Sequence, residues 1–162
     1  MITSIKLFKE SLRNSIIEHL TNAAIGTIVD ESDVYQYVEQ LHYKDDPYSD
    51  MENDGNLAQR IEVYKQFKLM EIDIDQIQFH QFLTDLDTVK SYSNKFNETQ
   101  KYPPIVLGHQ FLTNDEDFSI EKDPEGNPII IGEDYEVIDG AHRINALLQN
   151  NITKVKAWVG IL

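Results

Sequence analysis

Cysteine is absent from the 162-residue sequence, which excludes disulfide bonds, thiolate metal sites and thiol-based catalysis. Long hydrophobic runs are also lacking, since no stretch approaches the ~18 apolar residues that a membrane-spanning helix needs. The N-terminus has neither a continuous apolar segment nor a small-residue cleavage site, so it has the pattern of an amphipathic helix rather than of a signal peptide. These absences predict a cytoplasmic protein without membrane association.

Basic residues are scarce. The sequence has 14 Lys and Arg against 28 Asp and Glu, which gives a net charge of −14 and a pI of about 4.6. Affinity for DNA or RNA comes largely from Lys and Arg, so the charge disfavours direct nucleic-acid binding and favours a basic protein partner. Hydrophobic residues nevertheless make up 41% of the chain, which is enough for a globular core.

The first part of the chain, residues 1–67, has mainly helical patterns. Apolar residues recur with helical spacing at 4–24, at 34–41 and at 57–67. A polar stretch rich in Asp, broken by Pro and Gly, covers residues 45–55 and predicts a loop. We therefore expect residues 1–67 to form a helical N-terminal extension.

In the second part, residues 68–162, strand and helix patterns alternate. The sequence Glu125-Gly126-Asn127 predicts a tight turn between two short strands. The expected fold class is α+β, a small mixed sheet with packed helices. Strands are predicted at 69–77, 105–107, 118–120, 129–131, 135–138 and 155–161, and helices at 84–96 and 141–150.

The segment that points most directly to chemistry is Tyr135–Arg143. An alternating strand leads into Asp139-Gly140, and a helix begins at once with His142 and Arg143 in its first turn. Cations at a helix N-terminus cost a few tenths of a kcal/mol, unless an anion such as phosphate lies among them. The alternative is that Asp139 caps the helix and that both basic side chains point into water.

Three segments in this order resemble the ParB/sulfiredoxin superfamily, including its ParB-like N-terminal and nuclease domains, over residues of about 68–162. They are Met70–Ile74 with Asp85–Val89, then Tyr102–Leu107, then Tyr135–Ala146 followed by Val155 and Trp158-Val159. The third segment is similar to the family's strand, Gly-x-(His/Arg)-Arg box, helix and closing strand.

The resemblance implies a ParB/sulfiredoxin-like fold that binds nucleotide phosphates, as an NTPase or phosphotransferase using ATP, ADP or CTP with Mg²⁺. Gly140, His142 and Arg143 match the phosphate box, with Asp139 before it and Ala141 within it. On this interpretation Arg143 grips two phosphate oxygens, so Arg143→Ala should lose most nucleotide binding while the melting temperature stays nearly unchanged. The family's sulfinic acid reductases need a cysteine in this box, so that activity is excluded.

The serine kinases of the same family use a carboxylate near the end of the first strand. The resemblance therefore implies Glu71, Asp73 and Asp75 as candidate catalytic residues, acting as a metal ligand or base. Acidic residues at alternate positions are also what the solvated face of a strand looks like, so this alternative stays open.

Two other functions remain. The acidic charge fits a non-catalytic interaction protein that engages a basic partner, as a nucleic-acid mimic or an inhibitor of a DNA-handling protein. The family also includes nucleases, although few basic residues are available here to hold DNA.

His80 and His109 follow predicted strands and are candidate metal ligands, but no recognised ligand spacing supports them. The sequence does not predict the oligomeric state.

Overall fold

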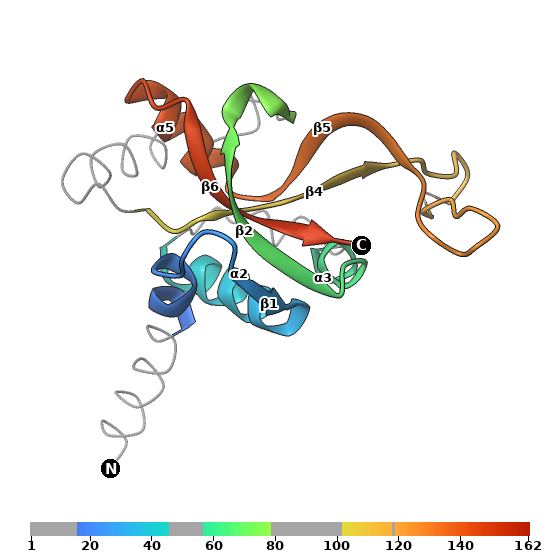
Figure 1. Ribbon diagram of the computed structural model, residues 1–162, viewed down its shortest axis with the longest axis horizontal. Coiled ribbons are helices and arrows are strands. Elements are labelled where there is room, and N and C mark those ends of the chain that lie inside the picture. Colours follow the sequence, from blue (N-terminus) through green and yellow to red (C-terminus); the bar gives the residue numbers. More distant parts are fainter. Residues whose placement is uncertain (1–15, 46–56, 79–101, 118) are drawn as a thin grey trace, which may run out of the picture.

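A computed structural model of the chain describes residues 16–45, 57–78, 102–117 and 119–162 (Figure 1). These residues form a six-stranded sheet with helices, which confirms the α+β class. Residues 16–21 are helical. The other elements are β1 (Ile28–Asp30), α2 (Glu31–Asp45), α3 (Leu57–Glu62), β2 (Gln66–Asp73), the 3₁₀ helix η1 (Ile74–Gln76), β3 (Ile77–Gln78), β4 (Ile105–Phe111), β5 (Ile130–Asp139), α5 (Ala141–Gln149) and β6 (Lys154–Ile161).

The sheet is mixed, with the strand order β1-β2-β6-β4-β5-β3. β2 runs antiparallel to β1 and β6, while β4 runs parallel to β6 and antiparallel to β5. The short strand β3 pairs in parallel with β5 at Tyr135 and Glu136. Only η1 separates β2, the second strand in this order, from β3, the strand at the opposite edge of the sheet. The helix η1 also contacts β5.

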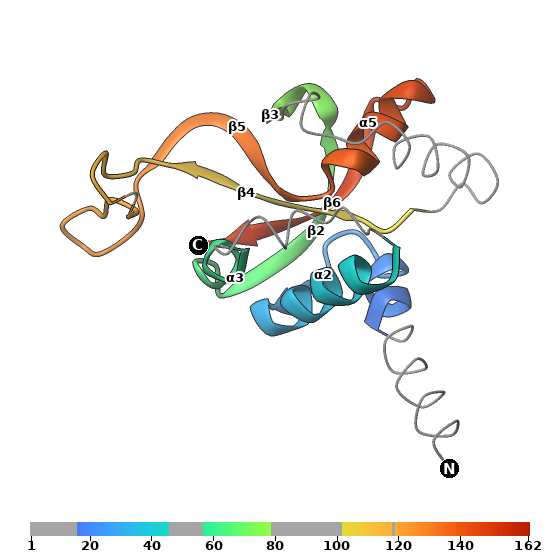
Figure 2. The same ribbon diagram turned by 180° about the vertical axis from the view of Figure 1, so that it is seen from behind.

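Helices cover both faces of the sheet. Figures 1 and 2 show α2 and α3 on one side and α5 on the opposite side. The alternation of side chains along each strand separates the core accordingly into two clusters. The cluster under α2 includes Leu69, Val106, Ile138 and Trp158, and the cluster under α5 includes Ile72, Ile105, Leu107, Val155 and Ala157.

The prediction for residues 57–67 was wrong at its C-terminal end. The helix α3 ends at Glu62, and β2 has already begun at Gln66. The physical reason is a change of period: Phe67 and Leu69 are buried while their neighbours are exposed, and this segment pairs along its whole length with β6. Residues 28–30 also form a strand, so the first 67 residues are not entirely helical.

Residues before and after position 67 both contribute side chains to the cluster under α2. Leu20 and Tyr37, from the N-terminal region, pack in the same cluster as Leu69 and Trp158. The indole Nε1 of Trp158 donates a hydrogen bond to the carbonyl oxygen of Leu20 at 3.3 Å. The boundary expected between residues 67 and 68 falls inside β2.

Between β4 and the middle of β5 the chain forms a projecting arm, residues 112–134, that extends away from α5 (Figure 1). A turn forms close to the predicted position 125–127, over Asp123 to Gly126: Gly126 has a φ of 86°, and its N–H donates to the carbonyl oxygen of Asp123. The strand predicted at 118–120 was wrong for the described residues 119 and 120, because Ile120 makes only an isolated bridge with Thr113. At the base of the arm the β4–β5 register shifts between the pairs His109↔Tyr135 and Phe111↔Ile130, so β5 bulges there.

The predicted helix at 84–96, the candidate ligand His80, the first part of the 4–24 helix and nearly all of the 45–55 loop lie outside the described residues. Within the parts that the structure does describe, no helix is both long and apolar enough to cross a membrane.

Candidate functional site

The α5 site begins at Gly140, where β5 ends and α5 starts. Gly140 occupies the N-cap position with a φ of 118° and a ψ of 19°, a conformation that favours glycine. A Cβ atom at this position would lie 2.5 Å from Cγ2 of Ile105 and 2.8 Å from its Cβ. Glycine is therefore required both by the backbone and by the close approach of β4. The expectation that Asp139 is the cap residue was wrong by one position, since Gly140 takes this place.

Both basic residues of the first turn are buried. His142 is 6% exposed and Arg143 is 5% exposed, so the alternative in which they point into water was wrong. An isolated buried cation is costly, and Arg143 avoids this cost through an ion pair with Asp139. Its Nη2 lies 2.5 Å from Oδ2 of Asp139, and both side chains are less than a tenth exposed.

The other terminal nitrogen of Arg143 bonds to residues far away in the sequence. Nη1 donates to the carbonyl oxygens of Pro104 at 2.7 Å and Pro103 at 2.9 Å, and it lies 3.5 Å from the hydroxyl of Tyr37. That hydroxyl itself donates to the carbonyl oxygen of Pro104 at 2.5 Å. We call Tyr37, Pro103, Pro104, Asp139 and Arg143 the arginine network. It joins α2, the segment before β4 and the start of α5.

This geometry makes Arg143 a structural residue. Both of its terminal nitrogens lie on acceptors from the protein, and Asp139 neutralises its charge. The prediction that Arg143 grips the phosphate stays a prediction, and the burial of Arg143 now predicts that its removal lowers stability, unlike the expectation from the sequence. Sequence reasoning missed the partners Tyr37, Pro103 and Pro104. No local signal could have found Tyr37, which precedes Arg143 by 106 residues.

The electrostatics at the start of α5 favour an anion. The first backbone N–H groups of a helix have no partner within the helix, and the helix dipole places about half a positive charge there. The first turn of α5 contains no acidic residue, and the cap residue Gly140 offers no side-chain acceptor. Ala141, the first residue of α5, is half-buried.

The candidate carboxylates lie on β2 and η1. Glu71 and Asp73 alternate with Ile72, whose side chain packs in the cluster under α5, so these two carboxylates face the opposite side of the sheet. Glu71 and Asp73 are exposed, and Oε1 of Glu71 lies 4.0 Å from Nζ of Lys154. Asp75 is also exposed but belongs to η1, which contacts β5, the strand that leads into Gly140. Asp75 is thus the member of the trio that belongs to an element in contact with this strand.

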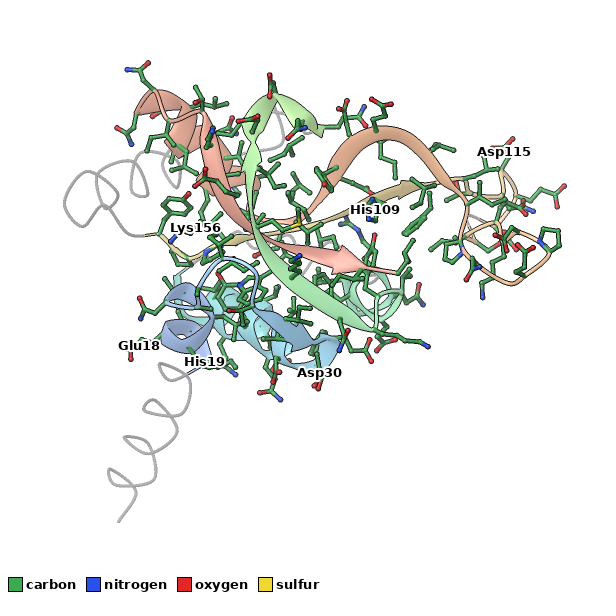
Figure 3. The ribbon with its side chains drawn as sticks, in the orientation of Figure 1. Glu18, His19, Asp30, His109, Asp115 and Lys156 are labelled. Atoms are coloured by element: carbon green, nitrogen blue, oxygen red, sulfur yellow. The ribbon has the colours of Figure 1, made fainter. Side chains whose placement is uncertain are left out.

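His109 lies on β4 at the base of the arm, away from α5 (Figure 3). Burial lowers the pKa of its imidazole, although a hydrogen bond with the backbone of Gly160 opposes the shift. Its backbone N–H donates to the hydroxyl of Tyr64 at 2.7 Å, and burial raises the pKa of Tyr64 to about 12. No group of three His, Asp or Glu side chains suited to a metal ion occurs among the described residues.

Comparisons with known proteins gave little sequence similarity. No family model matches the chain, and no curated protein matches it. Among solved structures, the chain is similar to sulfiredoxin from Arabidopsis thaliana, with 13% sequence identity and a TM-score of 0.39. The match covers 56% of this chain and 82% of the sulfiredoxin chain. At this identity the similarity concerns the fold, and nothing about activity follows from it.

Proposed function

We propose that this protein binds the phosphates of a nucleotide at the N-terminus of α5 and acts as an NTPase or phosphotransferase of the ParB-like type. One observation carries the proposal: α5 starts at a glycine cap, and its first turn holds His142 and no acidic side chain. The nearby carboxylate of Asp139 is neutralised by Arg143, so it does not repel an anion as a free carboxylate would.

The residues of the box take different parts in this proposal. Gly140 sets the backbone direction at which α5 begins, the small side chain of Ala141 would leave the first N–H groups within reach of a phosphate, and the His142 imidazole would supply a side-chain donor. Asp139 and Arg143 hold the start of the helix in place through the arginine network. ATP, ADP or CTP would bring Mg²⁺ with its phosphates, with Asp75 the first choice and Glu71 and Asp73 the further candidates for a metal ligand or base.

The net charge of −14 does not oppose such a site. Salt screens charges beyond about 10 Å at 0.1 M, so a small anion at α5 interacts mainly with the local groups. A long polyanion would meet the acidic surface over its whole length. The charge is therefore compatible with a nucleotide and disfavours the nuclease alternative.

A charge placed in the first turn of α5 tests the proposal. Ala141→Glu adds a carboxylate where an anion stabilises the helix, so we expect the melting temperature to stay or rise while nucleotide binding is lost. Gln149→Glu adds the same charge at the other, exposed end of α5 and should leave binding unchanged. The measurement is a calorimetric titration of ATP, ADP, CTP and GTP with Mg²⁺. Unchanged binding by Ala141→Glu, or no binding by the wild type, would contradict the proposal.

The arm supports a second candidate, a non-catalytic protein that engages a basic partner. Residues 112–134 contain eight acidic residues and one lysine, so this short segment carries half of the net charge. Leu112, Ile130 and Ile131 in this arm are exposed large hydrophobic side chains. Apolar side chains surrounded by one sign of charge fit a complementary, basic protein surface.

Neutralisation of the arm tests this second candidate. A variant with Glu125→Gln, Glu133→Gln and Asp134→Asn should lose a partner with a basic DNA-binding surface. The control with Glu18→Gln, Glu39→Gln and Glu62→Gln changes three exposed carboxylates elsewhere and should retain it. Loss of the partner by both variants would indicate a general charge effect and count against the arm.

A further inference from the structure

We propose that Tyr37 on α2 is a positioning residue for the α5 site, so that the docking of α2 and the binding of an anion at α5 are coupled. The ligand part of this inference rests on the proposed function. The coupling between α2 and the start of α5 can be measured without any ligand.

A continuous set of hydrogen bonds leads from Tyr37 to the cap residue. The hydroxyl of Tyr37 donates to the carbonyl oxygen of Pro104, which also accepts from Nη1 of Arg143. Through Nη2, Arg143 holds the carboxylate of Asp139, the residue immediately before Gly140. A displacement of the Tyr37 hydroxyl would therefore act on Asp139 through the carbonyl of Pro104 and the guanidinium of Arg143.

Packing provides a second route between the same elements. Ile105 follows Pro104 in the chain and lies so close to Gly140 that even a Cβ atom has no room between them. The proline rings fix φ at both Pro103 and Pro104, and Pro103 is restricted further because it precedes a proline, so this segment has little conformational freedom. A shift of the carbonyl of Pro104 is thus transmitted to Ile105 and from there to Gly140.

The network is rigid because it is buried. Tyr37 is fully buried, Arg143 and Asp139 are nearly so, and hydrogen bonds in such surroundings are stronger than they are in water. Tyr37 is also fixed by its own helix, since Val34, Val38 and Leu41 of α2 are buried in the same cluster. A movement of α2 on the sheet would therefore displace the hydroxyl donor instead of being absorbed by a mobile side chain.

Coupling of this kind is reciprocal. If the position of α2 changes the affinity of the α5 site, an anion at α5 must strengthen the docking of α2 by the same factor. The N-terminal region would then sense occupancy of the site without touching the ligand. Removal of one hydroxyl from the network should weaken nucleotide binding by roughly fivefold, at the low end of typical coupling.

Tyr37→Phe tests the inference, with Tyr64→Phe as its matched control. Both tyrosines are buried in the cluster under α2, and the hydroxyl of each bonds to a backbone group of β4 or its preceding segment. The Tyr64 hydroxyl bonds to the backbone of His109, at the base of the arm, whereas that of Tyr37 belongs to the arginine network. The two substitutions should lower the melting temperature similarly, so stability alone does not separate them.

Hydrogen exchange of the backbone amides of residues 141–146 provides the first readout, on the protein without nucleotide. Tyr37→Phe should accelerate exchange there by severalfold, and Tyr64→Phe should not. Equal effects of the two variants, or no effect of Tyr37→Phe, would overturn the coupling.

The affinity for the nucleotide that the wild type binds provides the second readout. Only Tyr37→Phe should reduce it, and equal affinities of the two variants would overturn the positioning role. If the wild type binds no nucleotide, the proposed function fails, whereas the coupling is still decided by hydrogen exchange.

Discussion

Arg143 and Asp139 form an ion pair inside the protein, with Nη2 of Arg143 2.5 Å from Oδ2 of Asp139. The pair spans the start of α5, because Asp139 is the last residue of β5 and Arg143 lies in the first turn. Ion pairs between residues four apart on a helix are often exposed and contribute little to stability. This pair is buried, and Arg143 also donates to two carbonyl oxygens. It therefore fixes the angle at which the helix leaves the sheet.

Breaking this pair from one side should be severe. Arg143→Ala leaves the carboxylate of Asp139 buried without its cation, so we expect a loss of about 3–5 kcal/mol in the free energy of unfolding. Adding Asp139→Asn removes the stranded charge, and the double variant should be more stable than Arg143→Ala alone. Urea denaturation of the wild type and the two variants measures both effects. A melting temperature of Arg143→Ala close to that of the wild type would contradict the structural role.

Much of this region could be predicted from local sequence patterns. Period-2 alternation and runs of β-branched residues indicated β4, the end of β5 and β6, and helical spacing indicated α5. The strand predicted at 105–107 is part of β4, and Ile105, Val106 and Leu107 are fully buried in it. These elements were accessible because their patterns are set by which face each residue buries.

The partners of Arg143 could not be predicted in this way. An arginine at the start of a helix has the same local sequence whether it faces a phosphate, water or a buried carbonyl. The choice here depends on Tyr37 and on Pro103 and Pro104, which the fold brings together from distant parts of the chain. The strand β1 was missed for a similar reason, since its three residues gain their conformation by pairing with β2.

Gly140 should tolerate no side chain. Gly140→Ala combines an unfavourable φ of 118° with a Cβ placed against Ile105, and both costs add. Gly126→Ala is the matched control: its φ is 86°, but nothing lies within 4 Å of the added Cβ. We expect a loss of about 1–2 kcal/mol for Gly126→Ala, from backbone conformation alone, and a clearly larger loss for Gly140→Ala. Equal losses in thermal denaturation would show that the contact with Ile105 relaxes freely.

His109 should make stability depend on pH in the weakly acidic range. Because burial lowers its pKa in the folded state, the unfolded chain binds a proton more readily than the folded protein. Above the unfolded-state pKa of about 6.5, His109 is neutral in both states and does not affect stability. As the pH falls from there toward the lower folded-state pKa, protonation of the unfolded chain reduces the free energy of unfolding. The wild type should lose more stability than His109→Gln between pH 7.5 and 5.5, as measured by urea denaturation. Parallel losses in the two proteins would assign the slope to other groups.

The N-terminal region should be necessary for the stability of the sheet, which is testable at Leu20. This side chain is fully buried, and its backbone carbonyl accepts the hydrogen bond from the indole of Trp158, the single tryptophan of the chain. Leu20→Ala leaves a cavity in the cluster under α2, so we expect a loss of about 2–5 kcal/mol. Ile25→Ala changes a side chain that is 53% exposed and should cost much less.

The fluorescence of Trp158 during urea denaturation reports both variants of this test. A large effect of Leu20→Ala together with a small effect of Ile25→Ala would show that residues before β2 belong to the same folding unit as the sheet. Equally small effects would mean that the helix at 16–21 can leave the sheet at little cost, and that the α5 site depends on α2 alone among the N-terminal elements.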